Sequence, residues 1–361
     1  DSDTVARQGG DDFVVVLESV GNVAQVEKVA GIILELLKTP FDVGVGKDFY
    51  IGASIGVTMF PDPGADVTQL LSNADVAMYE AKKEGRNMYK VYSNEMTQVV
   101  ADRLELGNRL RQALTTEDEL RLYYQSQVEL TEGRVVGVEA LIRWHTPDGE
   151  VIPPGRFLPV AEEGGMMPDL DSYVLGVACR QIACWQQDGI EKITVAVNIT
   201  QPTFMAGGLV GRLTALLEET GIDPSWLELE ITEGALLEPS SQVLSTISGL
   251  KALGVALAID DFGTGYSSLN YLRKLPIEVL KIDKSFIDEI LESSEDRTLV
   301  KGIIDMVHAL GIEVVAEGVE NHQMAVLLQN MNCDLVQGYH YCRPIEDNKF
   351  VTLIKDSLCY I

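Results

Sequence analysis

The chain has 361 residues and a formal net charge of −27 at pH 7, from 55 acidic and 28 basic side chains. This charge argues against binding to nucleic-acid polymers, because lysine and arginine supply most of the affinity of a protein for a polyanion. The length predicts about two domains, and no run of roughly 20 apolar residues is present that could cross a bilayer.

Five cysteines and four histidines are scattered along the chain without CxxC or HxxxH spacing. We therefore expect reduced thiols in a cytoplasmic protein, and we find little support for a zinc site or a Ser-His-Asp triad. The first residues look like the interior of a domain, so we expect membrane attachment, where the whole protein has any, only through upstream residues.

The first 93 residues predict a small α/β segment. The stretch DTVARQGGDDFVVVLE predicts two strands joined by a tight turn at Gly9 and Gly10. SIGVTMF predicts a further strand, and LLSNADVAMYEAKKEGRNMYKVY an amphipathic helix. Residues 94–119 are charged and amphipathic, which predicts a helical linker.

From residue 120 onward, short apolar segments alternate with stretches of helical spacing, and each apolar segment has a polar residue near its C-terminal end. These polar residues are Gln125, Glu139, Asn198, Glu230, Asp260, Lys281, Glu317 and Gln337. Eight such repeats predict a (βα)8 barrel of the TIM type, in the α/β class. Only residues 131–134 separate the first two strands, so we expect a hairpin and an antiparallel first strand.

The C-terminal strand ends of such a barrel form its active site. We expect five carboxylates there but only two cationic side chains, Arg143 and Lys281. Each buried charge costs several kcal/mol unless it is compensated. The carboxylates are Glu139, Glu230, Asp260, Asp261 and Glu317. With the Asn198 amide, this oxygen donor set suits Mg²⁺ or Mn²⁺. Two ions about 4 Å apart that share Asp260 would suit phosphodiester cleavage. Any one of these acids alone is more often a helix cap or a salt-bridge partner.

Seven motifs in chain order resemble those of one known family, the EAL domain of cyclic di-GMP phosphodiesterases. They are EALIRW, VNIT, LELEITE, AIDDFGTGYSSL, LKIDKSF, VVAEGVE and QGYHYCRP. The resemblance implies a modified TIM barrel, which we place at residues 120–361, and hydrolysis of cyclic di-GMP to linear pGpG with two divalent ions, Mg²⁺ or Mn²⁺. Ser126 replaces the proline that family members often have after the first-strand glutamine.

The resemblance also implies a role for each matching residue. The metal ligands would be Glu139, Asn198, Glu230, Asp260, Asp261 and Glu317. Lys281 would position or activate the attacking water and Glu320 would support the site, together with the catalytic acids Glu139, Asp260 and Asp261. Substrate contacts would come from Gln125, Leu141, Arg143, Asp283 and Gln337. Glu233 would hold the DFGTGYSSL loop, through which we expect a homodimer, although simple packing explains Leu141 and Glu233 equally well.

The turn Gly9, Gly10, Asp11, Asp12, Phe13, together with SIG and ADVAMYEAKKEGRN, resembles the latter half of a GGDEF diguanylate cyclase domain, which we place at residues 1–93. Its nucleotide site would include Gly9, Gly10 and Asp11. Asp12 stands where the family has glutamate, and the half that supplies another metal aspartate is absent. We therefore expect a regulatory part that binds GTP, not an active cyclase.

Three alternatives stay open. A barrel of this family can bind cyclic di-GMP without cutting it, although such receptors typically lose metal ligands. An enolase-like lyase also gathers carboxylates and a lysine at strand ends, but it would not explain DDFGTGYSSL. A scaffold whose output is protein contact is compatible with the acidic surface.

Overall fold

The structure is a computed structural model, and it describes residues 3–42, 48–60, 66–116, 118–236, 240–263 and 272–355. It divides into two compact units, Asp1–Leu106 and Gly107–Ile361. Within the described ranges, no helix combines the length and the apolar character that a membrane span requires.

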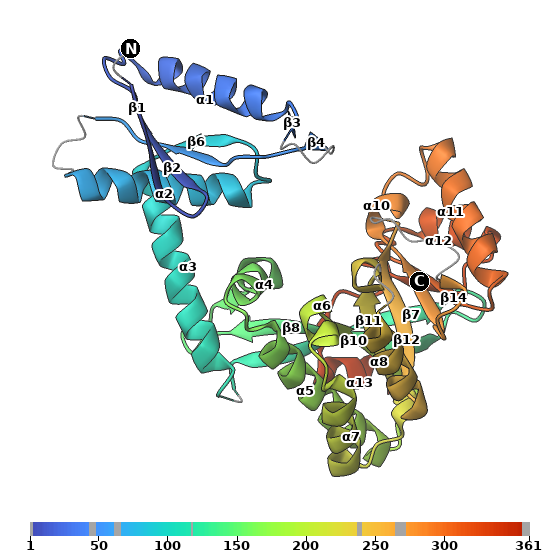
Figure 1. Cartoon of the computed structure of the whole chain (residues 1–361). Helices are drawn as coiled ribbons and strands as arrows, with labels where there is room; N and C mark the ends of the chain where they lie inside the picture. The colour runs from blue at the N-terminus through green and yellow to red at the C-terminus, as the bar shows by residue number, and fades with distance from the viewer. Residues whose placement is uncertain are drawn as a thin grey trace. The chain divides into compact units, whose positions relative to one another are not determined.

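The N-terminal unit is built from short strands and two helices. Strands β1 (Thr4–Gly9) and β2 (Asp12–Val16) form the predicted antiparallel hairpin. Strand β5 (Ile55–Val57) packs against helix α2 (Val67–Lys83), and Figure 1 shows strand β6 (Tyr89–Val91) between α2 and helix α1 (Val23–Leu37). Strands β5 and β6 are parallel, and β3 (Phe41–Asp42) pairs antiparallel with β4 (Asp48–Phe49).

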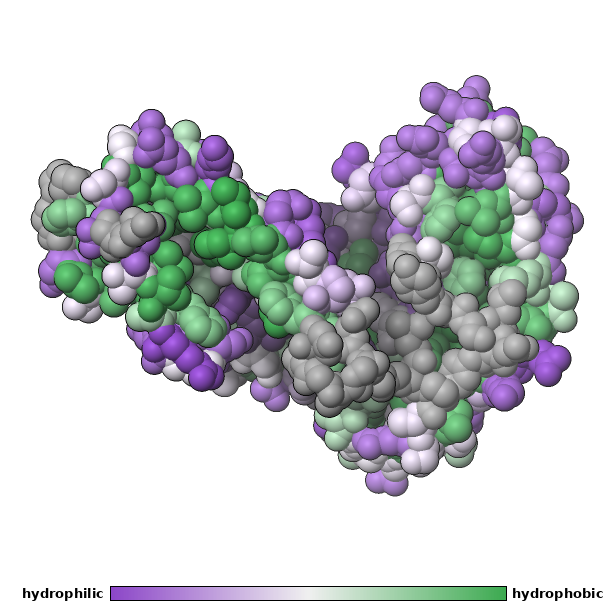
Figure 2. Space-filling view, turned by 45° about the horizontal axis from the view of Figure 1, so that its top comes forward, coloured by the Kyte–Doolittle hydropathy of each residue, from purple (hydrophilic) through white to green (hydrophobic). Residues whose placement is uncertain are grey.

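This unit leaves much apolar surface exposed, which Figure 2 shows as a broad green area. The exposed side chains include Val5, Phe13, Val15, Ile32 and Leu36. The hairpin β1–β2 has a solvent-accessible side chain at every position, so neither of its faces is covered.

The second unit is a closed barrel. Within the described residues, eight strands close it in the order β7, β15, β14, β13, β12, β11, β10, β8, with β8 pairing back to β7. Strand β7 is antiparallel to both of its barrel neighbours, and the other pairs are parallel, as the short first connection predicts. The strands are β7 (Leu120–Glu129), β8 (Val135–His145), β10 (Thr194–Ile199), β11 (Leu227–Thr232), β12 (Ala256–Phe262), β13 (Val279–Ile282), β14 (Glu313–Ala316) and β15 (Leu335–Gln337). The short strands β9 (Val151–Ile152) and β16 (Ile345–Glu346) extend the sheet beside β8 and β7.

Helices surround the barrel strands (Figure 1). They are α4 (Pro154–Glu163), α5 (Met167–Gln187), α6 (Gln201–Met205), α7 (Leu209–Thr220), α8 (Ser241–Ala252), α10 (Lys284–Ile287), α11 (Ser294–His308), α12 (His322–Asn330) and α13 (Asp347–Lys355), with the 3₁₀ turns η1 (Pro224–Trp226) and η2 (Glu233–Leu236). Helix α3 (Asn94–Ala113) leads into the barrel. Ser240, Ser293 and Asn321 cap α8, α11 and α12, because each side chain accepts a backbone N–H of the first helical turn.

Alternation along the strands separates an apolar outer layer from a mixed interior. Leu229 and Ile231 of β11 face the helices and join the main core. On the inner face, Ala258, Val279 and Val315 form a small separate cluster. We call these three residues the apolar floor. The polar residues Asp260, Lys281 and Glu317 follow them by two positions, toward the C-terminal strand ends.

Candidate active site

The candidate site lies one layer beyond the apolar floor, toward the C-terminal ends of the parallel strands. Side chains two positions apart on a strand point to the same face. Asp260, Lys281 and Glu317 follow the floor residues Ala258, Val279 and Val315 by two positions each, so they enter the barrel just beyond the floor. The floor residues therefore place apolar groups directly below Asp260, Lys281 and Glu317 on the inner face of the barrel.

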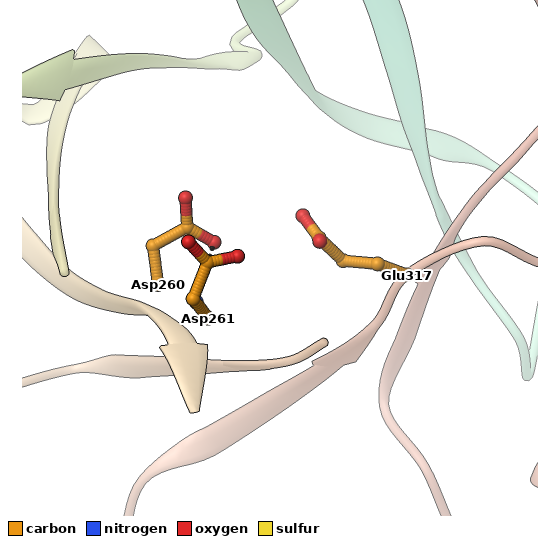
Figure 3. Close-up of side chains that lie close together, drawn as sticks. All are labelled: Asp260, Asp261 and Glu317. Atoms are coloured by element: carbon orange, nitrogen blue, oxygen red, sulfur yellow. Dashed lines mark hydrogen bonds between the residues drawn. The ribbon is translucent and has the colours of Figure 1, made fainter. Parts of the chain in front are cut away.

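Asp260 and Asp261 are neighbours, and a regular strand would direct them to opposite faces. The register between β12 and β13 shifts after Ile259, and Asp261 adopts a positive φ of 55°. This left-handed conformation is uncommon for residues other than glycine, although aspartate adopts it more readily than most, and residues held in it often lie at functional sites. As a result, carboxylate oxygens of Asp260, Asp261 and Glu317 all lie within 4.8 Å of one another, and Figure 3 shows Glu317 directed toward the two aspartates from a separate strand end.

Lys281 is the cation at the centre of the site, and its side chain is only 1% exposed. Its Nζ lies within ion-pair distance of four carboxylates, which belong to different strands or strand ends. The distances from Nζ are 2.7 Å to Glu317, 2.9 Å to Glu230, 3.2 Å to Asp260 and 3.6 Å to Glu139. One lysine therefore balances only part of the negative charge.

The pKa shifts reflect this imbalance. Burial would lower the pKa of Lys281, but the surrounding carboxylates outweigh burial and raise it well above its usual value. Burial raises the pKa of Glu230 well above the ordinary range and that of Glu317 to about 7, although Lys281 opposes both shifts. For Glu139, burial is outweighed by Lys281 and by the amides of Gln337 and Asn198, so its pKa is lowered.

Amide groups hold Glu139 from two sides. Asn198 Nδ2 donates to Glu139 Oε1 at 2.6 Å, and Gln337 Nε2 donates to Glu139 Oε2 at 2.5 Å. Gln337 also donates to Gln125 Oε1 at 3.3 Å, and Gln125 donates to the carbonyl of Cys342 at 3.1 Å. The site residues on β7, β8, β10 and β15 therefore form one connected network.

The donor set fits a hard divalent cation. Carboxylate and amide oxygens are the ligands that Mg²⁺ and Mn²⁺ prefer. Glu230 Oε1 is buried and has no hydrogen-bond partner among the described residues. A buried carboxylate oxygen without a partner is costly, and a bound cation would satisfy it.

Two of the predicted substrate residues, Leu141 and Arg143, lie toward the rim. Leu141 and Arg143 follow Glu139 by two and four positions on β8, so they share its face of the strand. Arg143 Nη1 donates to the carbonyl of Ile142 at 2.8 Å, and its guanidinium stacks on the ring of Tyr123. Burial lowers the pKa of Arg143, which still leaves a permanent cation at the mouth.

Other predicted residues lie outside this cluster. Glu233 is buried and accepts the backbone N–H of Gly263 at 3.0 Å. It therefore holds the start of the predicted loop, whose residues 264–271 lie outside the described part of the chain. Asp283 caps α10 through Ser285 N at 3.1 Å, and Glu320 is exposed and paired with Lys284 at 2.6 Å.

The glycine turn of the N-terminal unit is exposed at Gly9, Gly10 and Asp11. Arg7 crosses it, because its Nε and Nη2 donate to the Gly10 carbonyl at 2.9 and 2.6 Å. These contacts are internal to the hairpin, and they show a formed turn without defining a nucleotide pocket.

Two buried polar residues of the barrel interior, Gln127 and Glu228, are not among the predicted site residues. Gln127 donates to Gln337 Oε1 at 3.3 Å, and Glu228 lies two positions before Glu230 on the same face of β11. Burial raises the pKa of Glu228 to about 7. The sequence pattern could have predicted both residues. Gln127 follows the predicted Gln125 by two positions in LYYQSQ, and Glu228 precedes the predicted Glu230 by two positions in LELE.

Comparison with known proteins assigns both parts of the chain. The family model described as EAL domain matches residues 107–344, and the model described as diguanylate cyclase, GGDEF domain, matches residues 1–88. The limits 1–93, 94–119 and 120–361 drawn from the sequence stay predictions.

Curated relatives align with nearly the whole chain. Cyclic di-GMP phosphodiesterase NbdA of Pseudomonas aeruginosa is 39% identical over 96% of this chain and 44% of its own length. The bifunctional diguanylate cyclase/cyclic di-GMP phosphodiesterase MucR of the same species is 38% identical over 95% of this chain and 50% of its own length. The chain thus spans half or less of the length of these relatives.

Solved structures agree with the barrel described above. The PaMucR phosphodiesterase in complex with c-di-GMP has a TM-score of 0.65 and 39% identity, over 68% of this chain and 99% of that one. The EAL enzyme Bd1971, in its form bound to cAMP and cyclic di-GMP, has a TM-score of 0.67 and 30% identity, over 81% and 77%. The closed barrel, its antiparallel first strand and these matches show that the chain belongs to the EAL domain family, with a GGDEF domain match preceding the barrel.

Proposed function

We propose that the barrel is a metal-dependent phosphodiesterase that hydrolyses cyclic di-GMP to linear pGpG. The observation that carries the proposal is the convergence of Asp260, Asp261 and Glu317 beside Lys281 at the barrel mouth. The phosphodiesterase names of the relatives and the cyclic di-GMP complexes of related EAL structures support the choice of substrate. Receptors typically lose metal ligands, whereas this chain keeps the full carboxylate set.

We propose for each matching residue the role that the family resemblance implies. The ligands of two Mg²⁺ or Mn²⁺ ions would be Glu139, Asn198, Glu230, Asp260, Asp261 and Glu317. Such ions would acidify a water molecule and stabilise the negative charge that develops on the phosphate and leaving oxygens during in-line attack. Lys281 helps to keep the Glu139 carboxylate ionised, because it lowers the pKa that burial would raise, and it can hold the attacking water through an N–H.

Arg143 can clamp a phosphate oxygen at the rim, since its guanidinium is held by backbone and ring contacts. Gln125 and Leu141 would line the nucleotide groove beside it, and Asp283 and Gln337 would complete the substrate contacts. In the reaction, water oxygen bonds to one phosphorus and the ester bond to the 3′ oxygen breaks. A proton moves to that oxygen, which leaves pGpG with one free 3′ hydroxyl. The supporting role of Glu320 stays a prediction.

The direct test is incubation of the purified chain with cyclic di-GMP and Mg²⁺ or Mn²⁺, with pGpG measured by chromatography. Glu139→Gln should abolish product formation, because it removes a ligand charge in the centre of the network. Glu132→Gln is the matched control, since Glu132 lies in the same hairpin with a side chain that is 62% exposed. Tight binding of cyclic di-GMP without metal-dependent product would contradict hydrolysis and assign the barrel as a receptor.

We further propose that the N-terminal unit regulates the barrel and is not an active cyclase. The turn keeps Gly9, Gly10 and Asp11 but has Asp12 in the fourth signature position. GTP should therefore change the rate of pGpG formation without being converted to cyclic di-GMP. An unchanged rate, with no GTP binding by calorimetry, would contradict this role. We also propose the expected homodimer through the DFGTGYSSL loop, which sedimentation of the intact chain would test.

A further inference from the structure

Gln127 is a buried residue that the proposed chemistry leaves unused. It lies on β7 with only 3% of its surface exposed, directly opposite Gly137 on β8 and Gln337 on β15. A Cβ at residue 137 would lie 2.6 Å from Gln127 Oε1. The glycine therefore provides the space that the Gln127 amide occupies at the antiparallel seam of the barrel.

The hydrogen bonds of this seam have a fixed direction that begins at Glu139. An ionised carboxylate only accepts hydrogen bonds, so Gln337 must present Nε2 to Glu139 Oε2, at 2.5 Å. The Oε1 of Gln337 then faces Gln127, which donates from Nε2 at 3.3 Å. Reversing either amide would oppose two acceptors or two donors, so Gln127 stabilises one of the two orientations of Gln337.

We propose that Gln127 is a positioning residue of the metal site, which acts through Gln337 to hold the Glu139 carboxylate in the orientation that binds a divalent cation. The inference rests on the proposed function, because it assumes that Glu139 is a ligand. Partners beyond the ligands orient metal-binding side chains, and their removal typically lowers metal affinity about 10- to 100-fold. Gln127 stands two hydrogen bonds from the cation, so its effect belongs at the lower end of that range.

A double-mutant cycle tests this coupling with Mn²⁺ binding to the full chain, measured by titration calorimetry. Gln127→Met keeps the length of the side chain but removes its donor, and should weaken Mn²⁺ binding about tenfold. In the Gln337→Met background the same change should have no further effect, because the amide that Gln127 orients is already gone. Unchanged affinity, or an equal loss in both backgrounds, would overturn the proposal.

Gly137→Ala provides a second test that leaves Gln127 in place. The new methyl group would lie 2.6 Å from Oε1 at the flexible end of the Gln127 side chain, which must move, and 3.3 Å from the Thr194 carbonyl oxygen, which requires a backbone shift of only a few tenths of an ångström. Mn²⁺ binding should weaken while the thermal unfolding temperature stays close to that of the wild type. In the Gln127→Ala background, Gly137→Ala should have no effect on Mn²⁺ binding, and a loss there would contradict the proposal.

The two proposals fail in distinguishable ways. If the wild-type chain binds no Mn²⁺, as we expect of the Glu139→Gln variant, the proposed metal-dependent function itself is contradicted. A wild-type chain that binds Mn²⁺ as tightly as Gln127→Met and Gly137→Ala do would overturn only the role of Gln127.

Discussion

The barrel and the N-terminal unit both place adjacent aspartates beside a strand, yet their surroundings differ. Asp260 and Asp261 at the end of β12 approach Glu317 within 4.8 Å, whereas Asp11 and Asp12 lie exposed in the turn of a two-stranded hairpin. Among the described residues, the barrel carboxylates form the one group with spacing suited to a metal ion. Similar local sequence therefore has different chemical meaning in the two regions.

Closure of the sheet explains the difference. In a closed barrel every inward side chain meets residues of other strands, so charges that are distant in sequence share one small volume. A hairpin with two accessible faces leaves its side chains in water, where charges are screened and their interactions are weak. The barrel site thus depends on the order of strands that are distant in sequence. The turn at Gly9 and Gly10 in the N-terminal unit joins only two strands that are adjacent in sequence.

The largest expected effect concerns the cation in the barrel. Lys281→Met should destabilise the metal-free barrel by about 3–5 kcal/mol, since it leaves buried carboxylates without compensation. Urea unfolding followed by tryptophan fluorescence measures it, because all three tryptophans, Trp144, Trp185 and Trp226, lie in the barrel unit. Saturating Mn²⁺ should recover part of the loss.

The matched control is the exposed pair of Lys38 and Glu35 in the N-terminal unit, 2.5 Å apart with side chains 58% and 70% exposed. Lys38→Met should cost at most about 0.5 kcal/mol, measured by hydrogen exchange in α1. A barrel that tolerates Lys281→Met without metal would show that its carboxylates are mostly neutral.

Truncation of apolar side chains should also destabilise the barrel more than the N-terminal unit, with a smaller loss of stability than for Lys281→Met. Phe204→Ala should cost about 3 kcal/mol, because Phe204 is 1% exposed and packs in the barrel core. Phe13→Ala should change stability by less than about 0.5 kcal/mol, because Phe13 is 63% exposed. Hydrogen exchange of peptides from α6 and β2 measures both changes, and a large loss for Phe13→Ala would reveal that another part of the whole protein covers this face.

Metal addition should stabilise one region alone. Mn²⁺ at about 100 times its dissociation constant should stabilise the barrel by about 2.7 kcal/mol, because it binds the folded site and not the unfolded chain. Hydrogen exchange should slow in β10–β14 and stay unchanged in β1–β2, and EDTA should reverse the effect. Equal protection of both regions would point to a metal site in the N-terminal unit as well.

The sequence predicts much of the barrel because its signals are local. A polar residue at the end of each apolar run marks a strand, and the short link 131–134 predicts the β7–β8 hairpin that the structure confirms. Strand order then follows from alternation with helices. Site membership is largely predictable as well, since inward polar residues at strand ends must converge.

Details that depend on stagger and on backbone strain were not predictable. The sequence Asp260–Asp261 does not indicate that Asp261 adopts a positive φ, which brings its carboxylate to the same cluster as that of Asp260. The four ion pairs of Lys281 and the contact of Gln127 with Gln337 depend on which residues of distant strands share a layer. The motif of Glu320 predicts a supporting role at the site, which stays a prediction, and the sequence does not show that its side chain pairs with Lys284 at the surface.

The smallest expected effect concerns Ser126, at the position where the family often has proline. Its hydroxyl is fully buried on β7 and has no hydrogen-bond partner among the described residues. Ser126→Ala removes an unpaired polar group and should stabilise the barrel by about 1 kcal/mol.

Thr203 is the matched opposite case, because it is equally buried and its hydroxyl lies 3.1 Å from that of Thr200. Thr203→Val should therefore destabilise the barrel by about 1 kcal/mol, as it keeps the shape and removes a bonded partner. Tryptophan fluorescence in urea would measure both changes. A loss of stability in Ser126→Ala would mean that a bound water satisfies the hydroxyl, and that the antiparallel seam is hydrated where β7 meets the helices.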